Sequence, residues 1–188
     1  MNYKKCKHLI KEDYQAIPVK RMNKLETFIT SDSFKISYWF RIGSYLQSKK
    51  SIGAKIAYLF VQLIYKHYEH LAGVWIPLGT NISGGVFFTH TNGIVIAGGA
   101  TVKKNVWIFQ GVTIGAAYGK GNPIIDENAI LFAGAKVIGN VKVGKNAIVG
   151  ANAVVVKDVP DNAVVVGVPA VIKSYDGERI ANEYRSNK

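Results

Sequence analysis

The chain has few residues suited to disulfides or to a clustered metal site. Its 188 residues include one cysteine, Cys6, and four histidines, His8, His67, His70 and His90. A single cysteine excludes an internal disulfide and is typical of a reducing compartment, so we interpret Cys6 as an incidental thiol. Only one histidine lies beyond residue 70. A zinc site needs several converging ligands, so no metal is predicted.

Long hydrophobic runs are also missing. The longest apolar stretch covers residues 56–65, whereas a helix that spans a bilayer needs about 20 residues. The first residues are charged and no apolar segment follows them, so we expect no secretory leader. These features predict a cytoplasmic protein.

Acidic residues are scarce. The chain has 24 Lys and Arg against 12 Asp and Glu, a net charge of +12, and residues 1–70 hold 13 of the basic but only 5 of the acidic residues. Such an excess favours an anionic partner, either lipid headgroups, a phosphorylated cofactor or nucleic acid, or it serves solubility alone. The rest of the chain lacks interleaved basic and aromatic residues, so no nucleic-acid partner is predicted.

The dominant positive feature is a period of six residues beyond residue 76. An aliphatic residue recurs at every sixth position, and a small or short apolar residue follows each one by four. This period fits neither an α-helix nor an alternating strand, and it is typical of a parallel β-helix in which three hexads form one coil. About thirteen hexads between residues 76 and 160 predict roughly four coils. The predicted inward positions include Ile96, Val102, Ile108, Ile114, Ile125, Leu131, Val137, Val143, Val149 and Val155.

Two breaks interrupt the period. Between Phe88 and Ile96 the spacing is eight, so the register slips by two residues, and His90 lies in this slip. Between Ile114 and Ile125 several glycines and a proline predict a protruding loop. Interruptions of a solenoid often carry function. His90 is therefore either a surface or packing residue, or a base that accepts a proton from a hydroxyl near pH 7.

The N-terminal third has a different pattern. A short helix is predicted near residues 4–14, and two aromatic-rich, basic helices over residues 34–46 and 51–70, the first capped by residues 31–33. We interpret them as a cap on the open end of the solenoid; the alternative is a surface that lies on an anionic membrane. The predicted divisions are a helical region (1–72), a β-helix (73–175) and a polar C-terminal tail (176–188) with a short helix.

The segment from His90 to Ala100 resembles the catalytic-histidine segment of bacterial serine acetyltransferases. The hexads, the long loop and residues 165–170 follow in that family's order, and the match covers about residues 73–175. The helical region is also similar to that of the serine-acetyltransferase-like enzymes found with capsule and exopolysaccharide genes. The resemblance implies a left-handed β-helix, homotrimers with active sites between subunits, and direct transfer of acetyl from acetyl-CoA.

By the same resemblance His90 is the general base. Small residues would line the groove for the pantetheine arm, and lysines would meet the phosphates of CoA. The positions that match the family's CoA contacts are Ala116, Ala133, Ala151, Lys157, Gly167, Pro169 and Lys173.

Charged positions of the family pattern are replaced in this chain. Thr89 stands where an acidic residue would hold the ammonium of serine, and Gly121 and Asn122 stand where an Arg-His pair is associated with its carboxylate. A neutral acceptor is therefore favoured, with hydrogen bonds from Thr89, Thr91, Asn92 and Asn122.

The resulting prediction is an O-acetyltransferase for a capsule or exopolysaccharide sugar. Its acceptor is a free sugar or a lipid-linked saccharide, and the enzyme works in the cytoplasm or in peripheral contact with the inner face of the membrane. Serine O-acetylation and N-acetylation of an amino sugar are alternatives within the enzymes. The alternative from another class is a trimeric hexapeptide-repeat scaffold in which His90 is idle.

Overall fold

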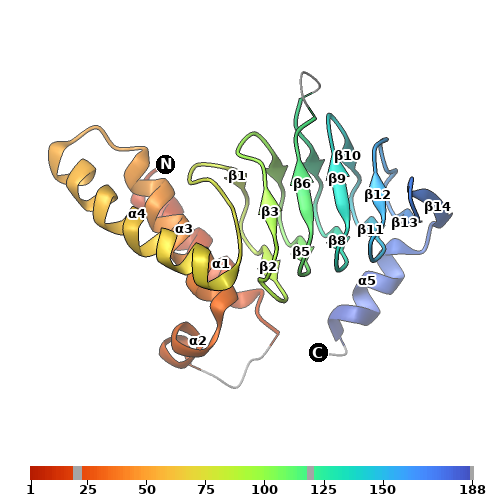
Figure 1. The fold of residues 1–188 in the computed structure, drawn as a ribbon. Helices are drawn as coiled ribbons and strands as arrows, with labels where there is room; N and C mark the ends of the chain where they lie inside the picture. Colours follow the sequence, from red (N-terminus) through yellow and green to blue (C-terminus); the bar gives the residue numbers. More distant parts are fainter. Residues whose placement is uncertain (19–22, 118–120, 187–188) are drawn as a thin grey trace.

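The computed structural model describes residues 1–18, 23–117 and 121–186. Four helices stand at one end of a row of stacked coils, and a fifth helix lies along the coils near the other end (Figure 1). The coils are built from short strands in three sheets, which form the three sides of a solenoid.

Each sheet collects one side of every coil. The first sheet contains β1 (Asn81–Ile82), β4 (Thr101–Val102), β7 (Ile124–Ile125) and β10 (Lys142–Val143). The second contains β2 (Phe87–Phe88), β5 (Trp107–Ile108), β8 (Ile130–Leu131), β11 (Ile148–Val149), β13 (Val164–Val166) and β14 (Val171–Ser174). The third contains β3 (Val95–Ile96), β6 (Thr113–Gly115), β9 (Lys136–Ile138) and β12 (Val154–Val155).

The pairing confirms the parallel β-helix that the period predicts. Ile130 of β8 lies beside Ile148 of β11 in parallel register, so one coil takes three hexads. The inward aliphatic residue of each hexad is buried and stacks on its counterpart in the next coil. A backbone bridge from Trp75 to Val95 places the start of the coils close to the predicted residue 76.

Asparagines form a ladder at the corner between the first and second sheets. The four asparagines of the ladder adopt a left-handed backbone conformation, with φ between 55° and 61°. Asparagine tolerates this region better than most residues. Their side-chain amides donate from coil to coil over 3.1–3.2 Å. The ladder consists of Asn105, Asn128, Asn146 and Asn162.

The helical region is larger than the sequence predicts. The helices are α1 (Tyr3–Gln15), α2 (Lys24–Thr30), α3 (Asp32–Gln47) and α4 (Ile52–Ala72). Ser31 caps α3 as expected, because its Oγ accepts a hydrogen bond from the backbone N–H of Phe34. The sequence did not predict α2, because seven residues are too few to show a helical period. Asn23 and Glu26 nevertheless form a capping box at its start.

The C-terminal segment turns back onto the solenoid. α5 (Gly177–Ser186) confirms the predicted short helix, but it is not a free tail. Its Tyr184 packs edge-on against Trp107 of β5 and against Phe132, which follows β8. The antiparallel strand β14, which pairs with β13, was not predicted, because it follows no hexad. The three divisions 1–72, 73–175 and 176–188 stay a prediction.

A buried ion pair joins the helices to the first coil. Asp13 and Arg41 are each 3% exposed, and Arg41 Nε donates to the Asp13 carboxylate over 2.8 Å. Arg41 also donates to the backbone carbonyl of Ser83, and Asp13 accepts from the backbone N–H of Gly85. Burial raises the pKa of the Asp13 carboxyl, and the Arg41 guanidinium opposes that rise. α1, α3 and the β1–β2 corner are therefore held together by one polar network.

We expect Arg41→Met to lower the free energy of unfolding by about 3–5 kcal/mol, because it leaves the Asp13 carboxylate buried without its partner. Urea denaturation followed by circular dichroism measures the change. The matched control is Arg179→Met, which breaks the exposed pair with Glu183 and should cost less than about 1 kcal/mol. Equal losses in the two variants would contradict the role of the buried pair.

Candidate functional site

His90 lies at a corner that is longer than its counterparts. Six residues separate β2 from β3, whereas four separate β5 from β6 and β8 from β9. The two extra residues are the register slip that the sequence indicates. They lengthen the corner that contains Thr89 to Asn92, and the His90 side chain is exposed there.

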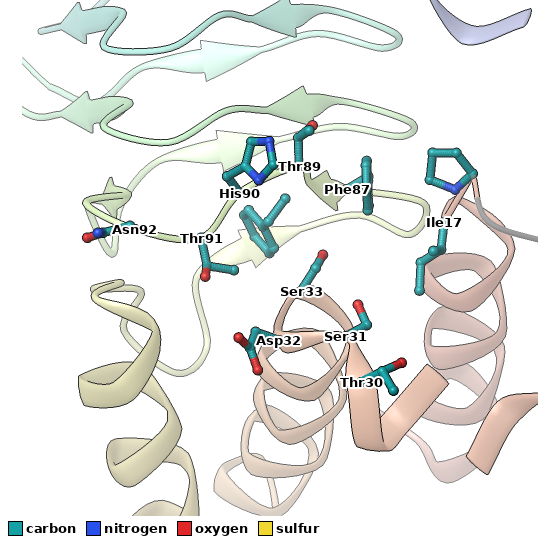
Figure 2. A pocket seen from close by; sticks show the side chains of 12 residues that line it. Ile17, Thr30, Ser31, Asp32, Ser33, Phe87, Thr89, His90, Thr91 and Asn92 are labelled. Atoms are coloured by element: carbon teal, nitrogen blue, oxygen red, sulfur yellow. The ribbon is translucent and has the colours of Figure 1, made fainter. Parts of the chain in front are cut away.

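A cavity of about 830 Å³ opens between this corner and the helical region. The β2–β3 corner supplies one wall, with Thr89, His90, Thr91 and Asn92. Residues 30–33, at the junction of α2 and α3, supply the facing wall (Figure 2). Ile17 and Phe87 close one end with apolar side chains. The cavity therefore combines an imidazole with hydroxyls, an amide and one carboxylate.

That carboxylate belongs to Asp32, which the sequence analysis did not consider as a site residue. Asp32 is the first residue of α3, and its side chain is 66% exposed and paired with Lys35 over 3.0 Å. It lies in the helical region, more than fifty residues before His90 in the chain. In the sequence, the one signal at Asp32 is its position at the predicted start of a helix.

Thr89 has an unsatisfied hydroxyl. Its Oγ1 is buried and has no hydrogen-bond partner among the residues that the structure describes. A buried hydroxyl without a partner costs free energy, so Thr89 is an unsatisfied polar residue in the wall of the cavity. Thr89, Thr91 and Asn92 line the same cavity as His90, and their role as acceptor contacts stays a prediction.

Asn122 is not part of this cavity. Its side chain lies against Gly99, at the corner between the third and first sheets, and the backbone N–H of Thr101 donates to the carbonyl of Pro123 there. The loop that carries Asn122 therefore leaves from another edge of the solenoid. Residues 118–120 of this loop lie outside the described residues.

The predicted cofactor positions fall into two columns. Ala133 and Ala151 lie at the same corner as His90, two and three coils further on, and Gly167 continues this column. Ala116 and Lys157 lie at the corner that also holds Asn122. Pro169 and Lys173 lie in the hairpin of β13 and β14. Ala133 is partly exposed and the other six are exposed, so their surfaces are open to a ligand.

The backbone is closely stacked beside the first column. Gly93 has φ of 77°, and a Cβ built on it would lie 3.3 Å from the Cα of Gly111 in the next coil. Lys136 holds the column by donating from Nζ to the carbonyls of Gly111 and Gly134 over 2.6 and 3.0 Å. The corners of this column are therefore closely packed from coil to coil.

The two columns stand on opposite edges of the third sheet. In every coil the His90 column precedes that sheet and the Ala116 column follows it. Within one copy of the chain, His90 and Ala116 therefore lie at different corners of the solenoid. Within the described ranges no group of three metal-ligating side chains occurs, and no helix there is long and apolar enough to cross a membrane.

Comparison with known proteins gives a consistent result. Residues 122–157 match the family of bacterial transferase hexapeptide repeats. A serine acetyltransferase from Staphylococcus xylosus is 38% identical over 133 residues, which are 69% of this chain and 62% of the relative. A serine acetyltransferase solved in complex with cysteine is 31% identical with a TM-score of 0.76, covering 92% of this chain and 71% of that one.

The chain belongs to the serine acetyltransferase family of hexapeptide-repeat transferases. A further member, the serine acetyltransferase from Brucella abortus strain S19 solved in complex with coenzyme A, is 27% identical with a TM-score of 0.77 over 92% of this chain and 69% of that one. The chain spans about three fifths of the length of the curated relatives that it matches.

These relatives overturn the predicted sugar O-acetyltransferase. The curated relatives and the solved structures named above are serine acetyltransferases, which favours the alternative of serine O-acetylation. The prediction failed because it searched the repeats alone for charges that could bind an amino acid. Asp32 supplies a carboxylate from the helical region, on the wall that faces His90.

Proposed function

We propose that this chain is an acetyl-CoA-dependent serine O-acetyltransferase. The observation that carries the proposal is the cavity that has the exposed His90 on one wall and Asp32 on the opposite wall. Acetylation of an amino acid with a hydroxyl side chain requires two groups. A base must take the proton of the hydroxyl, and an anion must bind the ammonium. Membership of the serine acetyltransferase family supports this assignment.

In the proposed reaction His90 takes the proton from the hydroxyl of serine while that oxygen attacks the carbonyl carbon of the thioester. The carbonyl oxygen becomes negative, and backbone N–H groups at the corner stabilise it. The carbon–sulfur bond then breaks, and the departing thiolate receives the proton from the His90 imidazolium. The products are O-acetylserine and the free thiol of CoA, so no acyl-enzyme is formed.

The acceptor would be held from two sides. Asp32 accepts hydrogen bonds from the ammonium of serine, and the buried Oγ1 of Thr89 donates to its carboxylate or accepts from its ammonium. Thr91 and Asn92 add polar contacts on the same wall. In the family pattern an acidic residue stands at the position of Thr89. In this chain the carboxylate of Asp32, from the helical cap, would take over its role.

The cosubstrate would follow the His90 column. Ala133, Ala151 and Gly167 leave space for the pantetheine arm, because none of them has a side chain larger than a methyl group. Lys173 would meet the phosphates near Pro169, and Lys157 would reach them from the other column. The family structure that contains coenzyme A supports this binding.

We further propose a homotrimer with the active site between subunits. The His90 column of one copy would face the column of a neighbouring copy that carries Ala116, Asn122 and Lys157, because a single copy holds these on opposite edges. A cytoplasmic location fits this reaction and stays part of the proposal. If the chain were only a scaffold, His90 would have no effect on thioester turnover.

We expect His90→Ala to lower kcat for serine acetylation by about 10²–10⁴-fold, because the hydroxyl loses its general base. Release of free thiol from acetyl-CoA, measured with and without serine, follows the reaction. His8→Ala is the control, since that histidine is exposed on α1 beside Glu12. Full activity in His90→Ala would contradict the mechanism, and no serine-dependent thiol release by the unaltered chain would favour the scaffold.

We expect Asp32→Asn to raise KM for serine by about 10-fold or more with a smaller change in kcat, since a charged hydrogen bond to the ammonium is worth about 1.5–3 kcal/mol. The KM for acetyl-CoA should not change. Lys35→Met is the control, because it removes the partner of Asp32 and keeps the carboxylate. An unchanged KM for serine in Asp32→Asn would exclude Asp32 from the acceptor site.

Mixed oligomers test the shared site. His90→Ala and Ala116→Trp, which fills the groove on the other column, should each be inactive alone. Unfolding and refolding the two together should restore up to about a quarter of the full activity, because random trimers contain some sites with both intact columns. Mass spectrometry should verify that mixed trimers form. If they form and no activity is recovered, each active site is built from the two columns of one copy.

A further inference from the structure

The face of α4 that points away from the solenoid is apolar and uncovered. Seven large side chains lie on it, and Ile52, Leu63 and Leu71 are 77%, 70% and 69% exposed. The first six follow the turns of the helix and form a stripe about 18 Å long, and Leu71 lies about two turns further on, beyond the exposed His67 and His70 of the same face. We call it the α4 outer face: Ile52, Ile56, Leu59, Phe60, Leu63, Ile64 and Leu71.

The opposite side of α4 is fixed to the rest of the molecule. Tyr65 is 1% exposed, and its hydroxyl donates to the backbone carbonyl of Ile76 over 2.7 Å. Glu69 accepts from the backbone N–H of the same residue over 2.9 Å, and Phe40 of α3 packs against the Tyr65 ring. Two residues advance a helix by about 200°, so Leu63 points away from the side that carries Tyr65. The α4 outer face is therefore turned outward, and Figure 1 shows α4 at the end of the molecule away from α5.

The charges around this face have one sign. α4 contains a single acidic residue, Glu69, which is 4% exposed and paired with Lys66 over 2.6 Å. Lys55 lies on α4, and Lys49 and Lys50 directly precede it. An apolar stripe bordered by lysines and free of exposed carboxylates is the arrangement of helices that lie in the interface of an anionic bilayer. If two copies met through this face, the lysines of one copy would lie near the lysines of the other. α4 has no exposed acidic residue that could pair with them.

We propose that the α4 outer face binds the surface of an anionic lipid bilayer. α4 would lie parallel to the membrane, with its apolar side chains among the acyl chains and its lysines at the phosphates. The contact is peripheral, because no helix in the described part of the chain can span a bilayer. In the proposed trimer three such faces would belong to one particle, which strengthens binding through multivalency. The proposal does not depend on the acetyl-transfer reaction.

Sedimentation with vesicles tests this surface. The full chain is mixed with vesicles of phosphatidylcholine alone or of phosphatidylcholine with phosphatidylglycerol, at low and at high salt. We expect binding to the anionic vesicles, weakened by salt, and little binding to the neutral ones. Lys49→Ala, Lys50→Ala and Lys55→Ala should each weaken binding by about fivefold, since one lysine near an anionic surface contributes about 1 kcal/mol.

The decisive variant is the double substitution Leu59→Ser and Leu63→Ser, which should weaken binding by at least about tenfold. The control is Leu25→Ser, which removes a leucine of α2 that is 69% exposed and should bind as the unaltered chain does. Because both leucines are exposed, the double variant should keep its far-ultraviolet circular dichroism and its thiol release with serine. His90→Ala should bind vesicles as the unaltered chain does. The membrane proposal and the proposed reaction can therefore be contradicted independently of each other.

Three outcomes would overturn the proposal. They are no sedimentation with anionic vesicles at low salt, equal sedimentation of the double variant and the unaltered chain, and a lower oligomer mass of the double variant by light scattering. The last result would assign the α4 outer face to a contact with a second copy.

Discussion

Stacking of the coils is the constraint on which the rest of the structure depends. Each hexad uses its aliphatic residue to stack inward and its backbone groups to pair with the coils on either side. Corners must be compact enough to repeat at the spacing of adjacent strands, about 4.8 Å, which explains the left-handed asparagines and the close approach of Gly93 to Gly111. A regular coil has no freedom left to present reactive groups. Chemistry is therefore confined to the places where a coil departs from the pattern, and His90 lies at such a place.

The helical cap packs on the first coil and forms one wall of the cavity beside His90. An open solenoid end would expose unpaired backbone groups and inward aliphatic side chains, and the cap covers them through contacts to the first coil. Arg41 binds backbone carbonyls of that coil, and Glu69 and Tyr65 satisfy both backbone groups of Ile76. These contacts fix α3, so the start of α3 faces the corner of His90 and brings Asp32 to the cavity. A part that is needed for stability thus also completes the candidate site.

The repeating part of the fold could be predicted from the sequence, because each hexad is a local unit whose period is visible without knowledge of distant contacts. The position of His90 in a longer corner could be predicted too, since a slip of two residues is a local irregularity, whereas its role as a base stays a proposal. α2 and β14 could not be predicted: α2 is too short to show a period, and β14 depends on pairing with β13. Asp32 was missed for a different reason. Its place in the cavity and its proposed role depend on how two parts of the chain, far apart in sequence, pack against each other, and no local pattern reports that packing.

The placement of Asp32 separates acceptor recognition from cofactor binding. In the proposed reaction the column of Ala133 and Ala151 belongs to the rigid solenoid, whereas the anion that receives the acceptor's ammonium comes from the cap. Thr89 contributes no charge, so the repeats by themselves do not discriminate an amino acid from a neutral alcohol. A change at the start of α3 would alter the charge opposite His90 and leave every coil intact. We infer that acceptor selectivity in this chain is set by the docking of the cap, and that acetyl-CoA binding is set by the solenoid and its β13–β14 hairpin.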